Sequence, residues 1–73
     1  MEDIFKRIES NVRDSLNKTY EVKLLHDDIS NYLYIIDGDK IKNIFNLDML
    51  YRSTRILNSD KLTKIILYCV VGK

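Results

Sequence analysis

Residues 31–40 read NYLYIIDGDK, and this stretch decides the fold because a strand-like run ends in a turn. The segment Asn31 to Ile36 is rich in aromatic and β-branched residues, which favour extended structure. Asp37-Gly38-Asp39 follows at once, and Asp-Gly between hydrophobic runs is a strong hairpin signal. We therefore expect a strand over 31–36, a tight turn, and a chain that folds back.

The acidic residues beside this strand do not match a metal-binding pattern. A calcium loop alternates oxygen ligands before its glycine and ends in a glutamate, whereas Asp37-Gly38-Asp39 has its glycine too early and no such glutamate. His26-Asp27-Asp28 lies at the other end of the strand, roughly 20 Å away at about 3.3 Å per residue. We interpret both segments as turns and expect no metal and no cofactor.

Two further segments flank the hairpin on its N-terminal side. Tyr20, Val22 and Leu24 alternate with charged residues, which predicts a strand antiparallel to 31–36. Before it, residues 2–18 form an expected helix whose apolar face carries Ile4, Phe5, Ile8, Val12 and Leu16. Acid–base pairs at i, i+4, among them Glu9–Arg13, stabilise such a helix by about 0.3 kcal/mol each.

The segment 39–51 is open to two interpretations. As a third strand after a three-residue 37–39 loop, it places Ile41 opposite Ile35 and puts Lys40 and Lys42 on the side of the tyrosines. A two-residue Asp37-Gly38 loop would instead bring both lysines to the Ile35 side, so we prefer the longer loop. The competing interpretation is a short helix around 44–51, with Asn46 as its N-cap.

The C-terminal third contains a dense run of apolar and β-branched residues. We interpret 52–57 as a strand, 58–60 as a turn and KLTKIILYCVV, residues 61–71, as a strand, although Asp60 could also cap a helix. The predicted fold is a single α+β domain over 1–73. Its N-terminal amphipathic helix packs on one face of a four- or five-stranded, mostly antiparallel sheet.

Composition points to a protein of a reducing compartment. Cys69 is the one cysteine, so no disulfide forms within the chain. The N-terminus has no apolar core of signal-peptide length, and no apolar run approaches the ~20 residues of a membrane span. We expect a cytoplasmic protein. The lack of Ala, Pro, Gln and Trp resembles small orphan proteins of low-GC bacteria and their phages or prophages.

Enzyme chemistry has little basis in this sequence. Nucleophilic catalysis needs a nucleophile within reach of a base, and nothing places Cys69 near His26, the one histidine. We expect the Cys69 thiol to be buried in its apolar run, which disfavours the thiolate. No glycine-rich phosphate loop is present. We therefore expect a protein that is not an enzyme and that has no small-molecule substrate.

Two strands carry apolar residues on both sides, and this pattern predicts a partner. Leu33 and Ile35 face one way while the neighbouring side chains face the other, and residues 65–71 behave alike. One helix covers one face only, so either 39–51 or another molecule covers the second. We expect a protein-interaction module, homodimeric or bound to a protein partner, with the contact formed by Tyr32, Tyr34, Ile36 and Tyr68.

The alternative function is weak nucleic-acid binding. Tyrosines that stack on bases beside phosphate-binding cations are a known mode of recognition. In the preferred register Lys40 and Lys42 share the face of the tyrosines, and Arg52, Arg55, Lys61 and Lys64 could extend this surface. The charge balance argues against a dedicated binder, because residues 1–37 have a net charge of −3 and residues 38–73 of +4, which gives +1 overall.

Overall fold

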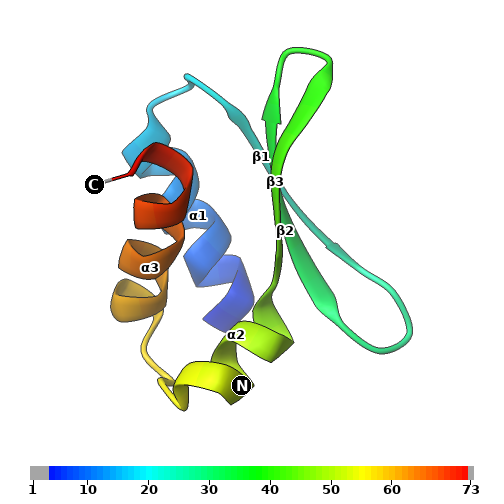
Figure 1. Ribbon diagram of the computed structural model, residues 1–73, viewed down its shortest axis with the longest axis vertical. Helices are drawn as coiled ribbons and strands as arrows, with labels where there is room; N and C mark the ends of the chain where they lie inside the picture. The colour runs from blue at the N-terminus through cyan, green and yellow to red at the C-terminus, as the bar shows by residue number, and fades with distance from the viewer. Residues whose placement is uncertain (1–3, 73) are drawn as a thin grey trace.

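The computed structural model describes residues 4–72. Its elements run α1 (Ile4–Leu16), β1 (Glu21–His26), β2 (Asn31–Asp37), β3 (Lys40–Asn46), α2 (Leu47–Thr54) and α3 (Ser59–Val71) (Figure 1). The α+β class is confirmed, as is the packing of the N-terminal helix on an antiparallel sheet. The expected four or five strands are wrong, because the sheet has three.

Helix α1 follows the predicted apolar stripe. Ile8, Val12 and Leu16 are buried, and Ile4 and Phe5 pack against the same core. The helix ends where Asn17 and Lys18 adopt positive φ angles of 49° and 67°, a left-handed conformation that stops helix propagation. Residues 2 and 3 of the predicted helix lie outside the described part of the chain.

The hairpin between β2 and β3 has a register that neither sequence interpretation contained. Asp37 pairs with Lys40, so the loop is Gly38-Asp39, and Gly38 has a φ of 64°. Glycine suits this first loop position because a type II′ turn requires positive φ there. A register shift follows, since Ile36 pairs with Ile41 but Ile35 pairs with Asn43. Lys42 is the extra residue of a β-bulge.

The segment after the hairpin is first a strand and then a helix. β3 ends at Asn46, whose side-chain Oδ1 accepts a hydrogen bond from the backbone N–H of Met49 at 3.1 Å. This is the N-cap expected for a short helix near 44–51, and α2 begins one residue later. The strand expected over 52–57 is wrong, because 52–54 belong to α2.

The strand expected over 61–71 is also wrong, because this segment forms α3. The Asn58 side chain, not Asp60, caps the helix by accepting from the N–H of Lys61 at 3.0 Å. At the other end Gly72 has a φ of 75°, and its N–H donates to the carbonyl of Tyr68. The buried positions of α3 recur at helical spacing, and they are Leu62, Thr63, Ile66 and Val70.

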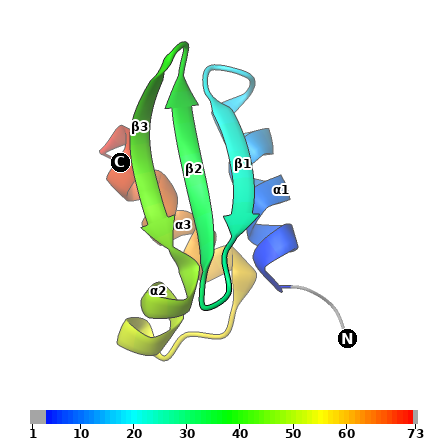
Figure 2. The same ribbon diagram turned by 90° about the vertical axis from the view of Figure 1, so that its right-hand side faces the viewer.

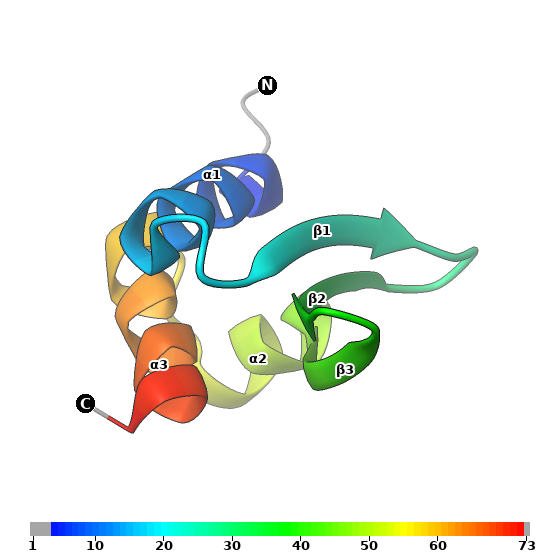
Figure 3. The ribbon, with the colours of Figure 1, turned by 90° about the horizontal axis from the view of Figure 1, so that it is seen from above.

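The elements form two layers. α1 and α3 pack side by side against one face of the sheet, in which the strand order is β1-β2-β3 (Figures 1 and 3). α2 lies beyond the end of the strands, on the helical side (Figures 1 and 2). The core between the layers contains Ile8, Val12, Leu16, Val22, Leu33, Ile35, Leu47, Leu62, Ile66 and Val70. The opposite face of the sheet has no helix or strand over it in residues 4–72.

Candidate functional site

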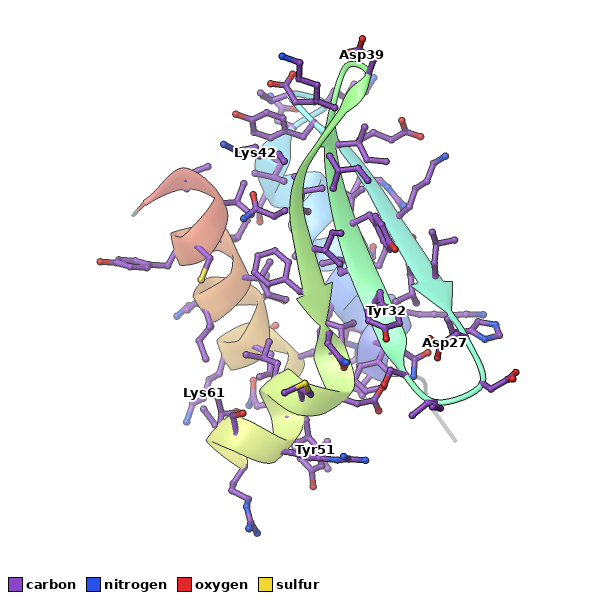
Figure 4. All side chains as sticks on the ribbon, turned by 45° about the vertical axis from the view of Figure 1, so that its right-hand side comes forward. Asp27, Tyr32, Asp39, Lys42, Tyr51 and Lys61 are labelled. Carbon is purple, nitrogen blue, oxygen red and sulfur yellow. The ribbon has the colours of Figure 1, made fainter. Side chains whose placement is uncertain are left out.

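The uncovered side of the sheet is the candidate site, and we call it the open face. Alternate residues of a strand point to opposite sides. In β2, Leu33 and Ile35 are buried under the helices, so their neighbours point outward, as Tyr32 does in Figure 4. With their partners on the flanking strands, the outward residues of the open face are Glu21, Lys23, Leu25, Tyr32, Tyr34, Ile36, Ile41, Ile44 and Asn46.

The open face is mainly apolar on β2 and β3, whereas β1 contributes the charged Glu21 and Lys23 beside Leu25. Directly paired residues form three cross-strand rows: Leu25, Tyr32 and Asn46; Lys23, Tyr34 and Ile44; and Glu21, Ile36 and Ile41. On the outer strands Leu25, Ile41 and Ile44 are 48%, 57% and 52% exposed. The side chains of the central strand are half-buried, because both flanking strands carry neighbours. The exposed apolar residues of the outer strands therefore adjoin the half-buried side chains of β2.

The charges on the open face neutralise each other. Lys23 and Glu21 are the two charged residues at the outward strand positions. The Lys23 Nζ lies 3.3 Å from the Glu21 Oε2, and both side chains are half-exposed at the β1 margin. A pair this exposed contributes little to stability. Its effect is that the open face offers no net charge to an acidic or basic ligand.

Helix α1 blocks the free edge of β1. The Arg13 Nη2 donates to the Val22 carbonyl at 2.8 Å, and the Leu24 N–H donates to the Glu9 Oε2 at 3.0 Å. Arg13 and Glu9 also pair with each other at 2.9 Å, as expected from their i, i+4 spacing. These side chains occupy backbone groups that an added strand would use, which is one way natural sheets prevent edge-to-edge pairing.

The other free edge, β3, carries different protection. It contains the bulge at Lys42, and Lys40 and Lys42 are both exposed. Bulges and lysines on an edge strand both disfavour the addition of another strand. The sheet is therefore protected at its two edges and uncovered on its open face.

The turn between β1 and β2 is structural. The Asp27 Oδ1 accepts hydrogen bonds from the N–H groups of Ile29 and Ser30, both at 2.8 Å. The bond from Ser30 has the larger effect and the bond from Ile29 the smaller, and together they hold the pKa of the Asp27 carboxyl below its usual value. Within residues 4–72 no three His, Cys, Asp or Glu side chains lie close enough to hold a metal ion.

The four residues predicted for partner contact do not form one surface. Tyr32, Tyr34 and Ile36 share the open face. Tyr68 is 64% exposed on α3, in the helical layer on the opposite side of the sheet. The prediction that Tyr68 lies beside Tyr32 and Tyr34 was wrong, because it required residues 61–71 to form a strand and they form α3.

The cations predicted for nucleic-acid contact are also separated. Lys40 and Lys42 lie at the hairpin end of the sheet, whereas Arg52 and Arg55 lie in and just after α2, at the opposite end (Figure 4). The Lys42 Nζ sits 5.5 Å from the ring centroid of Tyr20, a residue that packs against the core. Lys42 therefore does not lie beside Tyr34 as the predicted register required, because the cross-strand partner of Tyr34 is Ile44.

Cys69 and His26 lie far apart. Cys69 is exposed on α3, so the expectation that its thiol is buried was wrong. Tyr68 and Cys69 both point away from the core because the helical period buries Ile66 and Val70 instead. His26 ends β1, at the corner of the molecule opposite the C-terminal end of α3 (Figure 1).

Sequence reasoning missed Leu25, Ile41 and Ile44, which complete the open face. Leu25 follows the alternation of β1 and could have been included from its period of two. Ile41 reaches the open face through the two-residue Gly38-Asp39 loop. Ile44 reaches it through the bulge, because without the bulge Lys42 would pair with Ile35 and Ile44 with Leu33, on the buried side. The sequence contains no separate signal for that shift.

The fold and the open face define the class of protein: a small α+β protein whose three-stranded antiparallel sheet is covered by helices on one side only. Comparison with known proteins gave no match, since no family model, no curated protein and no solved structure is significantly similar to this chain. None of the described helices has the length and apolar character that a membrane span requires.

Proposed function

We propose that this protein is a small, non-enzymatic interaction module that binds another protein through the open face. The observation behind the proposal is the contrast between the two sides of one sheet. One side is buried by α1 and α3, and the other exposes Leu25, Ile41 and Ile44 around a tyrosine-bearing central strand. Covering this apolar surface removes it from water, which is the main driving force of protein association.

The tyrosines are suited to such a contact. Tyr32 and Tyr34 lie in the middle of the open face, half-buried between the flanking strands. A tyrosine ring contributes a large apolar area with few rotatable bonds, and its hydroxyl can hydrogen-bond across an interface. Residues that dominate binding energy tend to occupy the centre of an interface, so we place the main contact at Tyr34.

Nucleic-acid binding has less support than protein binding. Base stacking would need cations beside the tyrosines, and the cation nearest to Tyr34 across the strands, Lys23, is paired with Glu21. The lysines of the hairpin and the arginines of α2 lie at opposite ends of the molecule. A single strand of nucleic acid would therefore meet tyrosines and cations on different surfaces.

Site-specific photo-crosslinking tests the docking role. A photoreactive phenylalanine derivative replaces Tyr34 or Ile44, and in the matched control it replaces Tyr68, which is exposed like Ile44 but lies on α3. In the cells that express the protein, we expect crosslinked protein adducts of defined mass from positions 34 and 44 and none from position 68. Adducts of equal yield from all three positions, or none from the open face, would exclude this face as the docking surface.

A further inference from the structure

The open face suits one occupant best, which is a second copy of the same face. Resting on the proposed docking role, we infer that two copies of the chain pack open face against open face. The two sheets form the centre of the dimer, and the α1 and α3 layers form its outer surfaces. Charge, width and edge protection carry this inference, and each is a property of the described residues.

The first property is charge. The Glu21–Lys23 pair leaves the open face neutral, with the remaining area made of Leu, Ile, Tyr and one Asn. Like-charge repulsion opposes self-association of surfaces that carry a net charge, and this face has none. A strongly acidic or basic partner would find no complementary charge, so neutrality favours a neutral partner, of which an identical face is one.

The second property is width. Seven residues of β2 and three strands give a footprint of about 23 by 14 Å from standard strand spacings. A partner helix is about 10 Å wide, so it would leave one outer strand, and with it Leu25 or Ile44, uncovered. A second open face has the same width and covers all three strands at once, as in the packing of two sheets about 10 Å apart.

The footprint also sets the size of the dimer interface. The flat footprint is about 320 Å² per copy, or about 640 Å² for both copies, before the relief of the side chains is added. An interface of this size belongs with weak and transient contacts, below the standard size of stable complexes. We therefore expect a dissociation constant in the micromolar range, with monomer dominant in dilute solution.

The third property is the protection of both edges. Glu9 and Arg13 occupy backbone groups of β1, and the bulge and lysines protect β3. A dimer in which β3 pairs with the β3 of a second copy, in one continuous sheet, would have to remove the bulge and displace the lysines. Packing of the open faces leaves both edges as they are, and it buries the apolar rows that edge pairing would leave in water.

Two measurements on the purified chain test the inference. Sedimentation velocity is recorded from 1 to 500 µM for the wild type, Tyr34→Glu, Ile44→Lys and Tyr68→Glu, with circular dichroism to verify folding. We expect the open-face variants to raise the dissociation constant at least about tenfold and Tyr68→Glu to change it less than about twofold. Ile44→Lys, at an exposed position, keeps the test valid if Tyr34→Glu does not fold.

The geometry of the dimer is tested by a spin label on Cys69, the one cysteine, which is exposed on α3. Sheets about 10 Å apart with a helical layer about 10 Å behind each place the two labels roughly 30 Å apart or more. A distance below about 20 Å, association that only Tyr68→Glu weakens, or a monomer at 500 µM would each overturn the inference. A monomer that still gives open-face adducts in cells keeps the docking role and assigns it to a different protein.

Discussion

Replacing Ile66 by valine tests the assignment of α3 as a helix. Ile66 is fully buried, whereas Tyr68, two residues later, is mostly exposed. On a helix these two positions point in different directions, but on a strand they would share one face. The helix therefore gives two neighbouring substitutions very different costs, and a strand would make them alike.

The magnitude follows from burial. Removing one buried methylene from isoleucine costs about 1 kcal/mol, while changes at exposed positions stay within about 0.5 kcal/mol. A chain of 73 residues has a free energy of unfolding of about 4–11 kcal/mol, so Ile66→Val leaves it folded. With a urea m-value near 1 kcal/mol/M, the expected shift of the unfolding midpoint is about 1 M.

Urea denaturation followed by circular dichroism at one fixed protein concentration measures this difference. We expect Ile66→Val to lower the midpoint by about 1 M and the matched control Tyr68→Val to leave it within about 0.5 M. Equal shifts for the two variants would refute the helical assignment of residues 59–71, and with it the position of Tyr68 outside the open face.

Three further outcomes follow from local features. Gly38→Ala should lower the free energy of unfolding by about 1 kcal/mol, because φ at position 38 is positive even though an added Cβ would meet no other atom. Thermal denaturation measures this change, and an unchanged melting temperature would contradict the positive φ assigned to the turn. Glu9→Ala should cost about 1 kcal/mol and increase aggregation on heating, since the Leu24 N–H loses its acceptor, and unaltered solubility would argue against edge protection. The pKa of Asp27 is lowered in the folded state, so its contribution is present above its unfolded value of about 3.8 and is lost as pH falls through the lower folded pKa. Urea titrations at several pH values measure the stability difference between the wild type and Asp27→Asn, which should therefore shrink in that acidic range. A difference that grows as the pH falls would contradict a lowered pKa of Asp27.

The sequence predicted the elements whose periodicity is unambiguous. α1 has one apolar stripe, and β2 joins a β-rich run to a turn, so both were predicted correctly. The C-terminal segment failed because its dense β-branched run fits a buried strand as well as a buried helix. In the structure this segment packs against α1 as a helix, and the end signals at Asn58 and Gly72 agree with the helix.

The candidate site was predictable only in its central strand. Alternation alone places Tyr32, Tyr34 and Ile36 on one side, and the structure keeps them there. Of the neighbours on β3, Ile41 depends on the two-residue loop, and Ile44 depends on the bulge at Lys42, a shift of one residue that moves it onto the open face. A pattern along one strand cannot fix such a shift, because it arises from the pairing of two strands and their turn.

Solvent paramagnetic relaxation of methyl groups tests the central claim, which is that the chain leaves its own sheet face uncovered. In a dilute monomeric sample with a soluble gadolinium chelate, we expect the methyl signals of Leu25, Ile41 and Ile44 to broaden as strongly as those of Val71, an exposed residue of α3. The buried methyls of Leu33 and Ile66 serve as the protected reference. Protection of the Ile41 and Ile44 methyls equal to that of Leu33 in the monomer would contradict the claim, because the chain would then cover the open face itself.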